Sequence, residues 1–179
     1  SSILFQAEEL DRPVPFRRPD WAYDLSKIDC EWTLHPPGGP VHEGSWRFEY
    51  GGHLDTIDDA ETIHAELIRI FYGVWDFLKN HVDCGMSNTR ITWLSTVAGK
   101  RESRRIVGDL VLTQRDIETV RRFEDDVAYA GWSLDLHDPD GFFCKGRPTV
   151  FNFFPEIHSI PLRCLYARDA ANLWLAGRD

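Results

Sequence analysis

The sequence predicts an α+β fold, an antiparallel or mixed sheet with two main helices. Two stretches carry helical periodicity, at 58–80 and 113–127, and the short apolar strand-like segments outnumber them. No period repeats along the chain, which argues against a solenoid or a propeller. With 179 residues, 42% of them hydrophobic, residues 1–179 are expected to form a single domain around one core.

The first helix is expected between Asp58 and Asn80. Its apolar residues recur every three or four positions and would face the core: Ile63, Leu67, Ile70, Val74 and Phe77. Asp58 and Glu61 have the spacing of a capping box. Glycine inside a helix costs about 1 kcal/mol relative to alanine, so a close packing contact is expected at Gly73.

The second helix is expected to begin at Thr113, which forms a capping box with Asp116. Its inward positions would be Ile117, Val120, Phe123 and Val127.

Strands are expected on both sides of the helices. Alternation at Trp46–Tyr50 predicts a half-buried strand, and two β-branched segments, Ile91–Val97 and Ile106–Leu112, predict buried ones. Three shorter strand-like segments follow Gly131: Val150–Phe154, Ile160–Tyr166 and Leu173–Ala176. His35–Pro40 is expected to be a loop, and the Pro- and Arg-rich Asp11–Pro19 an extended surface arm.

The charge balance limits the classes of partner. With 29 acidic against 20 basic residues and a net charge of -9, the chain lacks the broad basic field that nucleic acids and anionic membranes require. No run of about 18 apolar residues is present to form a membrane span. Four cysteines stand far apart without a CxxC pair, which favours free thiols in the cytoplasm over a metal site or disulfides: Cys30, Cys84, Cys144 and Cys164.

The segment GKRESRRIVGDLVLT, Gly99 to Thr113, gathers four Lys or Arg residues and one Glu within six positions. One interpretation is a solvated connection whose cations pair with Glu102 and with surface carboxylates. In the other, Gly99 bends the chain at a strand end and the guanidinium groups of Arg101, Arg104 and Arg105 bind a carboxylate or a phosphate.

A second candidate site is the segment GWSLDLHDP, Gly131 to Pro139. Asp135 and His137 are two positions apart, so they share one face of an extended segment, and a carboxylate beside an imidazole suits a general acid or base. The alternative is a turn stabilised by the side chains of Asp138 and Asp140, with His137 simply exposed.

Four segments occur in an order that is informative in combination: YGVWDFLKN, GKRESRRIVGDLVLTQRDI, YAGWSLDLHDPDG and IPLRCLYARDAANLWLAGRD. Together with LFQAEELDRPVPF and WRFEYGGHLDTI, they resemble the FAD-dependent oxidoreductase family of the glutathione-reductase-like flavoprotein superfamily. The resemblance covers nearly the whole chain. It implies that Arg101, Glu102, Arg104 and Arg105 face the substrate or the flavin, and His137 with Asp135 is the candidate for proton transfer.

The resemblance also implies an FAD cofactor, held in an N-terminal unit that opens with GxGxxG. These 179 residues contain no such motif. They are therefore expected to be the substrate or cap domain, a fragment that ends at Gly177, Arg178 and Asp179 beside the cofactor. Its expected partners are the missing FAD-binding domain, a small-molecule substrate and, through uncovered apolar surface, other copies of itself. We expect the chain alone to be inactive and not to retain FAD.

One alternative function stays open at this point. Exposed indole rings are stacking platforms for sugars, so the chain is alternatively a non-catalytic module that binds carbohydrate or another small ligand. The candidate platforms are Trp21, Trp32, Trp46 and Trp132, unless these residues belong to the core.

Overall fold

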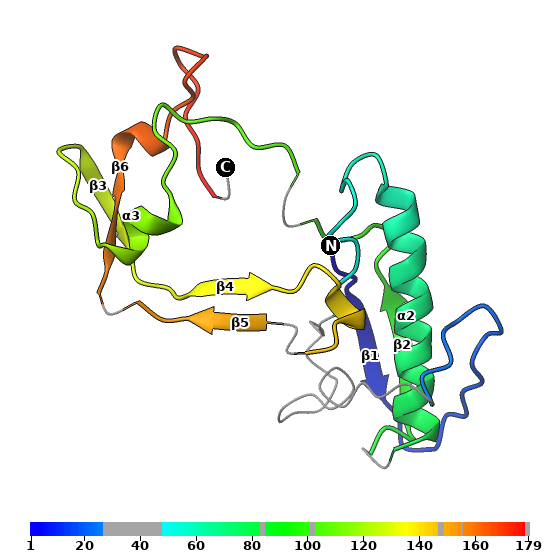
Figure 1. Ribbon diagram of the computed structural model, residues 1–179. Coiled ribbons are helices and arrows are strands. Elements are labelled where there is room, and N and C mark those ends of the chain that lie inside the picture. Colours follow the sequence, from blue (N-terminus) through cyan, green and yellow to red (C-terminus); the bar gives the residue numbers. More distant parts are fainter. Residues whose placement is uncertain (27–47, 83–84, 101–102, 147–148, 155, 178–179) are drawn as a thin grey trace. The chain divides into compact units, whose positions relative to one another are not determined.

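The computed structural model describes residues 1–26, 48–82, 85–100, 103–146, 149–154 and 156–177 (Figure 1). The chain divides into two compact units. Unit 1 comprises Ser1–Ser103 and His137–Pro148, and unit 2 comprises Arg104–Leu136 and Thr149–Asp179. The described residues form two α-helices and three two-stranded sheets, which confirms the α+β class. The single-domain organisation stays a prediction.

The sheet of unit 1 is an antiparallel pair. Strand β1, Phe5–Glu9, pairs with β2, Thr89–Leu94, and an irregularity in register lies between Gln6 and Ala7. The strand expected at Ile91–Val97 was wrong in its bounds and in its burial, because Trp93 and Val97 are exposed. In a pair of strands that packs its apolar side chains toward one helix, the residues that point the other way stay in solvent.

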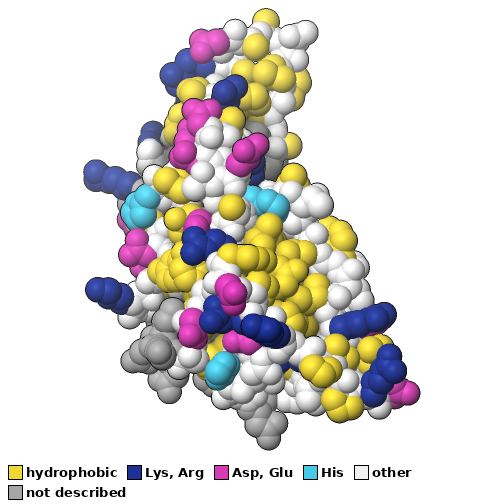
Figure 2. All heavy atoms as spheres, turned by 90° about the vertical axis from the view of Figure 1, so that its right-hand side faces the viewer, with side chains coloured by type: hydrophobic (Ala, Val, Ile, Leu, Met, Phe, Trp, Pro, Cys, Tyr) yellow, Lys and Arg dark blue, Asp and Glu magenta, His cyan; other side chains and the backbone are white. Residues whose placement is uncertain are grey.

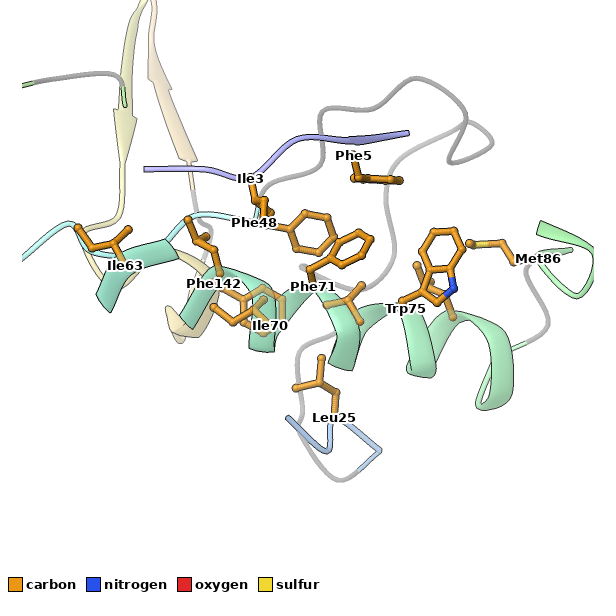
Figure 3. Packing of buried hydrophobic residues seen from close by; sticks show 13 residues of the cluster. Ile3, Phe5, Leu25, Phe48, Ile63, Ile70, Phe71, Trp75, Met86 and Phe142 are labelled. Carbon is orange, nitrogen blue, oxygen red and sulfur yellow. The ribbon is translucent and has the colours of Figure 1, made fainter. Parts of the chain in front are cut away.

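Helix α2, Ala60–Asn80, packs its apolar side against this sheet (Figure 3). Four of the five predicted inward residues are fully buried, and Phe77 is half-buried. Phe71 lies at the centre of the cluster, with its ring centroid 5.0 Å from that of Phe5, 5.6 Å from Phe48 and 5.8 Å from Trp75. Aromatic packing of this kind accounts for much of the stability of a small core.

The start of α2 differs from the expected capping box. The helix begins at Ala60 with Asp59 as its N-cap residue, and no side chain caps it. Instead, Asp55 Oδ1 accepts hydrogen bonds from the backbone N–H groups of Ile57 and Asp58, at 2.7 and 3.0 Å. The prediction of Asp58 as the cap was therefore wrong, because Asp58 belongs to the turn before the helix and stands one residue before the N-cap, Asp59.

The expected close contact at Gly73 is confirmed. A Cβ atom at this position would lie 2.5 Å from the carbonyl oxygen of Tyr23, well inside van der Waals contact. The glycine therefore lets the segment after the arm lie directly on the helix.

Tyr23, in the segment after the arm, also contacts α2 through its side chain. Its hydroxyl donates to Glu66 Oε2 at 2.6 Å, and Arg69 donates to Glu66 Oε1 at 2.6 Å while its guanidinium lies 4.6 Å from the Tyr23 ring centroid. Burial and the carboxylate of Glu66 raise the pKa of Tyr23 to about 12. Figure 2 shows the side of the molecule to which α2 and the arm belong, where hydrophobic side chains gather with acidic and basic ones among them.

Unit 2 contains short strands. β3, Asp126–Ala130, pairs antiparallel with β6, His158–Pro161, and β4, Leu134–His137, pairs with β5, Thr149–Asn152. The last residue of β4, His137, belongs to unit 1. Two single turns of 3₁₀ helix complete the described elements, Gly141–Phe143 in unit 1 and Leu162–Cys164 in unit 2.

The second helix is much shorter than expected. Its Thr113–Asp116 capping box is confirmed, but α3 covers only Gln114–Glu118 and buries no residue. Val120 has a φ of 50°, which ends the helical path, and Val127 is an exposed residue of β3. The inward face predicted through Val127 was therefore wrong.

The other expected strands were found only in part. Ile106–Leu112 is not a buried strand, since Ile106, Val107 and Val111 are exposed and only Gly108 forms a bridge, to Ala167. Of the three segments after Gly131, Val150–Phe154 overlaps β5 in part. Ile160–Tyr166 was mostly wrong, because only Ile160 and Pro161 belong to β6 and Leu162–Cys164 form a turn of 3₁₀ helix. In the third segment, Trp174 forms one bridge, to Tyr166. The loop at His35–Pro40 and the residues Trp46 and Arg47 lie outside the described residues.

An ion pair in unit 2 gives a prediction about acid stability. Arg163 donates to both carboxylate oxygens of Asp125, at 3.0 and 2.8 Å, and holds the pKa of Asp125 at about 2, below its usual 3.8. A lowered pKa in the folded state adds stability above the unfolded value, and this is lost as the pH falls. The difference in unfolding free energy between wild type and Asp125→Asn should therefore shrink from about pH 4 to about pH 2. Urea unfolding across this range measures it, and a difference independent of pH would contradict the prediction.

Candidate functional site

The clearest arrangement of functional groups in unit 1 is a histidine–carboxylate pair. His137 Nδ1 lies 2.7 Å from Glu49 Oε2, and 26% and 20% of the two side chains are exposed. Glu49 follows the buried Phe48, and its backbone bridges to Ser2. The two residues come from segments 88 positions apart.

The pair defines the hydrogen-bonding state of the imidazole. An ionised carboxylate only accepts hydrogen bonds, so Nδ1 carries the proton that it shares with Glu49. In that tautomer Nε2 is the ring nitrogen with a lone pair that can accept a proton. A half-buried imidazole in a fixed orientation has the properties of a general acid or base.

Glu49, a carboxylate that the sequence analysis did not name, contacts His137. Asp135 lies two residues earlier in β4, is half-buried and belongs to unit 2. Its role in proton transfer stays a prediction. Sequence reasoning missed Glu49 because the partner comes from a distant segment, although the predicted alternation at Trp46–Tyr50 puts Glu49 on the face opposite Phe48.

The turn after His137 fixes the geometry of the pair. Asp138 Oδ1 accepts from the Asp140 N–H at 2.9 Å, and the Asp138 carbonyl accepts from the Gly141 N–H at 2.9 Å. The alternative turn interpretation expected this role for Asp138, whereas Asp140 contacts His53 and His137 is half-buried. Gly141 has a φ of +55°, and a Cβ atom there would lie 2.3 Å from the carbonyl oxygen of Glu49. Only glycine permits this approach, in which Phe142 N–H also donates to that carbonyl at 2.7 Å.

A second histidine–carboxylate pair joins the same two segments. His53 Nε2 lies 3.1 Å from Asp140 Oδ1, and about two thirds of the His53 side chain is exposed. Exposed pairs of this kind contribute little free energy. We therefore treat Glu49–His137, and not His53–Asp140, as the candidate site.

The arginine-rich segment is described in part. Arg101 and Glu102 lie outside the described residues, and Arg104 and Arg105 are exposed at the beginning of unit 2. Gly99 extends the β1–β2 pair, because it exchanges two backbone hydrogen bonds with Ser2, at 3.0 and 2.7 Å. A role of these residues toward substrate or flavin stays a prediction.

The comparison with known families now decides the identity of the chain. The model of the FAD dependent oxidoreductase family matches residues 1–179. The chain belongs to this family. No curated protein and no solved structure matches it. Membership in the FAD dependent oxidoreductase family confirms the resemblance seen in the sequence and ties the chain to flavoprotein chemistry.

The start of helix α2 in this family member lacks the features of a dinucleotide pyrophosphate site. Such a site needs a glycine-rich turn before a helix N-terminus without negative charge. The long helix α2 instead begins beside Asp55, Asp58, Asp59 and Glu61, which repel an anion. Gly177 has a φ of +98°, a Cβ atom added there would meet no described atom within 4 Å, and Arg178 and Asp179 lie outside the described residues.

Among the described residues, no cluster of metal-ligating side chains is found, and no described helix is both long and apolar enough to cross a membrane. Cys144 and Cys164 are half-buried, and the Cys144 thiol donates to the Gly146 carbonyl at 3.3 Å. Cys30 and Cys84 lie outside the described residues.

Two of the four candidate stacking residues are described. Trp21 packs edge-on against Tyr72, with ring centroids 5.2 Å apart, whereas 78% of Trp132 is exposed. Trp32 and Trp46 lie outside the described residues. Trp21 belongs to unit 1 and Trp132 to unit 2, and the sugar-binding alternative stays a prediction.

Proposed function

We propose that this chain is the substrate-binding region of an FAD-dependent oxidoreductase and that His137 transfers a proton at the substrate. Membership in the family supports the oxidoreductase class. The observation that carries the proposal is the 2.7 Å contact between His137 Nδ1 and Glu49 Oε2.

In this proposal the two residues have different roles. Glu49 is a positioning residue: it accepts a hydrogen bond from Nδ1–H, fixes the ring and stabilises the imidazolium form. His137 takes a proton from the substrate or gives one to it at Nε2. Such a transfer is needed because oxidation or reduction of a carbon changes the protonation of the group beside it. Phe142 and Gly141 hold the backbone of Glu49 in place for this purpose.

We propose that the arginine-rich segment binds an anionic part of the substrate. A guanidinium group offers a planar fork of N–H donors that matches a carboxylate, whereas lysine offers a single point charge. The residues concerned are Arg101, Glu102, Arg104 and Arg105. The exposure of Arg104 supports its availability to a ligand.

We further propose that FAD is bound by a separate domain that carries GxGxxG and that docks on this chain. Large exposed hydrophobic side chains in unit 2 support a docked partner, because such surface is unfavourable in water; they include Trp132, Phe153, Ile157 and Trp174. In the absence of that domain, the same surface favours self-association of the chain.

The proposal predicts that the purified 179-residue chain does not retain FAD. After incubation with excess FAD and desalting, we expect no flavin absorbance in the protein fraction, because the start of α2 lacks the features of a pyrophosphate site. A flavin-to-protein ratio near one after desalting would contradict it. Joining the chain to the proposed FAD-binding domain should restore both flavin binding and turnover, and a flavin-loaded but inactive assembly would count against the substrate-binding role.

A further inference from the structure

A hollow of about 460 Å³ lies in unit 2 beside α3. This volume is in the range of sites for small ligands. Leu110 and Val111 contribute apolar side chains to its lining, and Arg115, Asp116 and Arg121 contribute charged ones. The residues differ from those of the Glu49–His137 site and belong to the other unit.

The carboxylate of Asp116 already accepts three hydrogen bonds from groups of the protein. It accepts hydrogen bonds from the Thr113 hydroxyl at 2.5 Å, from the Thr113 N–H at 3.0 Å and from Arg121 Nη1 at 2.9 Å. These donors, led by the Thr113 hydroxyl, hold the pKa of Asp116 at about 2. The Asp116 carboxylate is therefore ionised at neutral pH, and its negative charge interacts with groups of the protein itself.

The two arginines differ in how they are held. Arg121 is fixed between Asp116 and the ring of Phe123, whose centroid lies 4.7 Å from the guanidinium carbon. Only part of its five N–H donors is used by these contacts. The Arg115 side chain makes no ion pair or hydrogen bond with another described residue, so its charge is not compensated within that part of the chain.

We propose that this hollow binds a small monocarboxylate with a short apolar chain. Two guanidinium groups against one carboxylate leave a single positive charge, which matches a monoanion better than a phosphate dianion. The forked donors of arginine fit a carboxylate, and the apolar part of the ligand lies against Leu110 and Val111. The proposal does not depend on the function proposed for the Glu49–His137 site.

The test is an NMR titration of the full ¹⁵N-labelled chain with butyrate, with butylammonium and inorganic phosphate as comparison ligands. We expect saturable shifts of the amides from Thr113 to Arg121 with butyrate, weaker binding of phosphate and none of butylammonium. Arg115→Gln should weaken butyrate binding about tenfold, because a charge-assisted hydrogen bond is lost. Arg122→Gln is the matched control, since Arg122 is an exposed arginine that lies over Tyr129 and does not line the hollow.

The outcomes separate clearly. Unchanged amide positions outside the hollow show that each variant is folded. The proposal is overturned if the wild-type chain shows no saturable shift, if butylammonium or phosphate binds as well as butyrate, or if Arg122→Gln weakens binding as much as Arg115→Gln.

Discussion

Substitution of His137 by glutamine is expected to lower turnover of the FAD-loaded oxidoreductase about 100-fold to 10 000-fold, the usual contribution of a general acid or base. Glutamine keeps approximate size and polarity but transfers no proton. The free energy of unfolding should change little, because the contact lies at a partly exposed position. Steady-state kinetics and thermal melting of the same variant measure the two effects.

Glu49→Gln tests the positioning role separately. The amide can still occupy the place beside Nδ1, but it carries no charge to stabilise an imidazolium ion, so a smaller loss of turnover is expected than for His137→Gln. The ¹⁵N shifts of the imidazole, which distinguish its tautomers, should change in this variant. His53→Gln is the matched control, because His53 forms a similar but exposed pair with Asp140. Equal losses in His53→Gln and His137→Gln would contradict the assignment.

Substitution of Phe71 by alanine is expected to destabilise unit 1 by about 3–5 kcal/mol, the range found for large-to-small changes of buried aromatic residues. Phe71 is fully buried and packs against the rings of Phe5, Phe48 and Trp75. Its neighbours come from several segments, so they cannot all close on the cavity. Urea unfolding followed by tryptophan fluorescence measures the change. Phe153→Ala, at a residue that is 84% exposed, is the control and should change stability by about 0.5 kcal/mol at most. A loss below about 1 kcal/mol for Phe71→Ala would show that this cluster is not the core.

The helix α2 was predictable because its signal is local. The spacing of Ile63, Leu67, Ile70 and Val74 records one buried face, and the contact at Gly73 follows from the cost of glycine in a helix. The same rule overextended α3, because apolar periodicity does not reveal the turn at Val120. The segment at Ile106–Leu112 was predicted as a buried strand from its composition. Burial of a strand, however, depends on how many partners cover it, and this is not a local property.

The residues of the candidate site also differ in whether a local sequence pattern predicts them. His137 was found because a histidine in a short, charged strand is visible locally. Glu49 was not, since contacts between distant segments bring it to His137, among them the approach of Gly141 to the Glu49 carbonyl and the hydrogen bond from Phe142 N–H. The hollow beside α3 was likewise missed as a site, although its capping box was predicted. Arg115 and Arg121 become neighbours only because the helix stops at Glu118 and the chain folds back.

The separation between Glu49 and His137 has a consequence for the order in which the protein folds. Almost all of the unit 1 core comes from residues before position 104, and the later segment adds Phe142 to it while it brings His137 to Glu49. During synthesis, the ribosome therefore releases β1, α2 and β2 well before it releases His137. Closing so long a loop costs entropy that only docking of the 137–148 segment repays. Opening of that segment alone would cost less than global unfolding. Loss of proton transfer should consequently precede loss of the core when the protein is heated, and hydrogen exchange at Phe142 should report that earlier event.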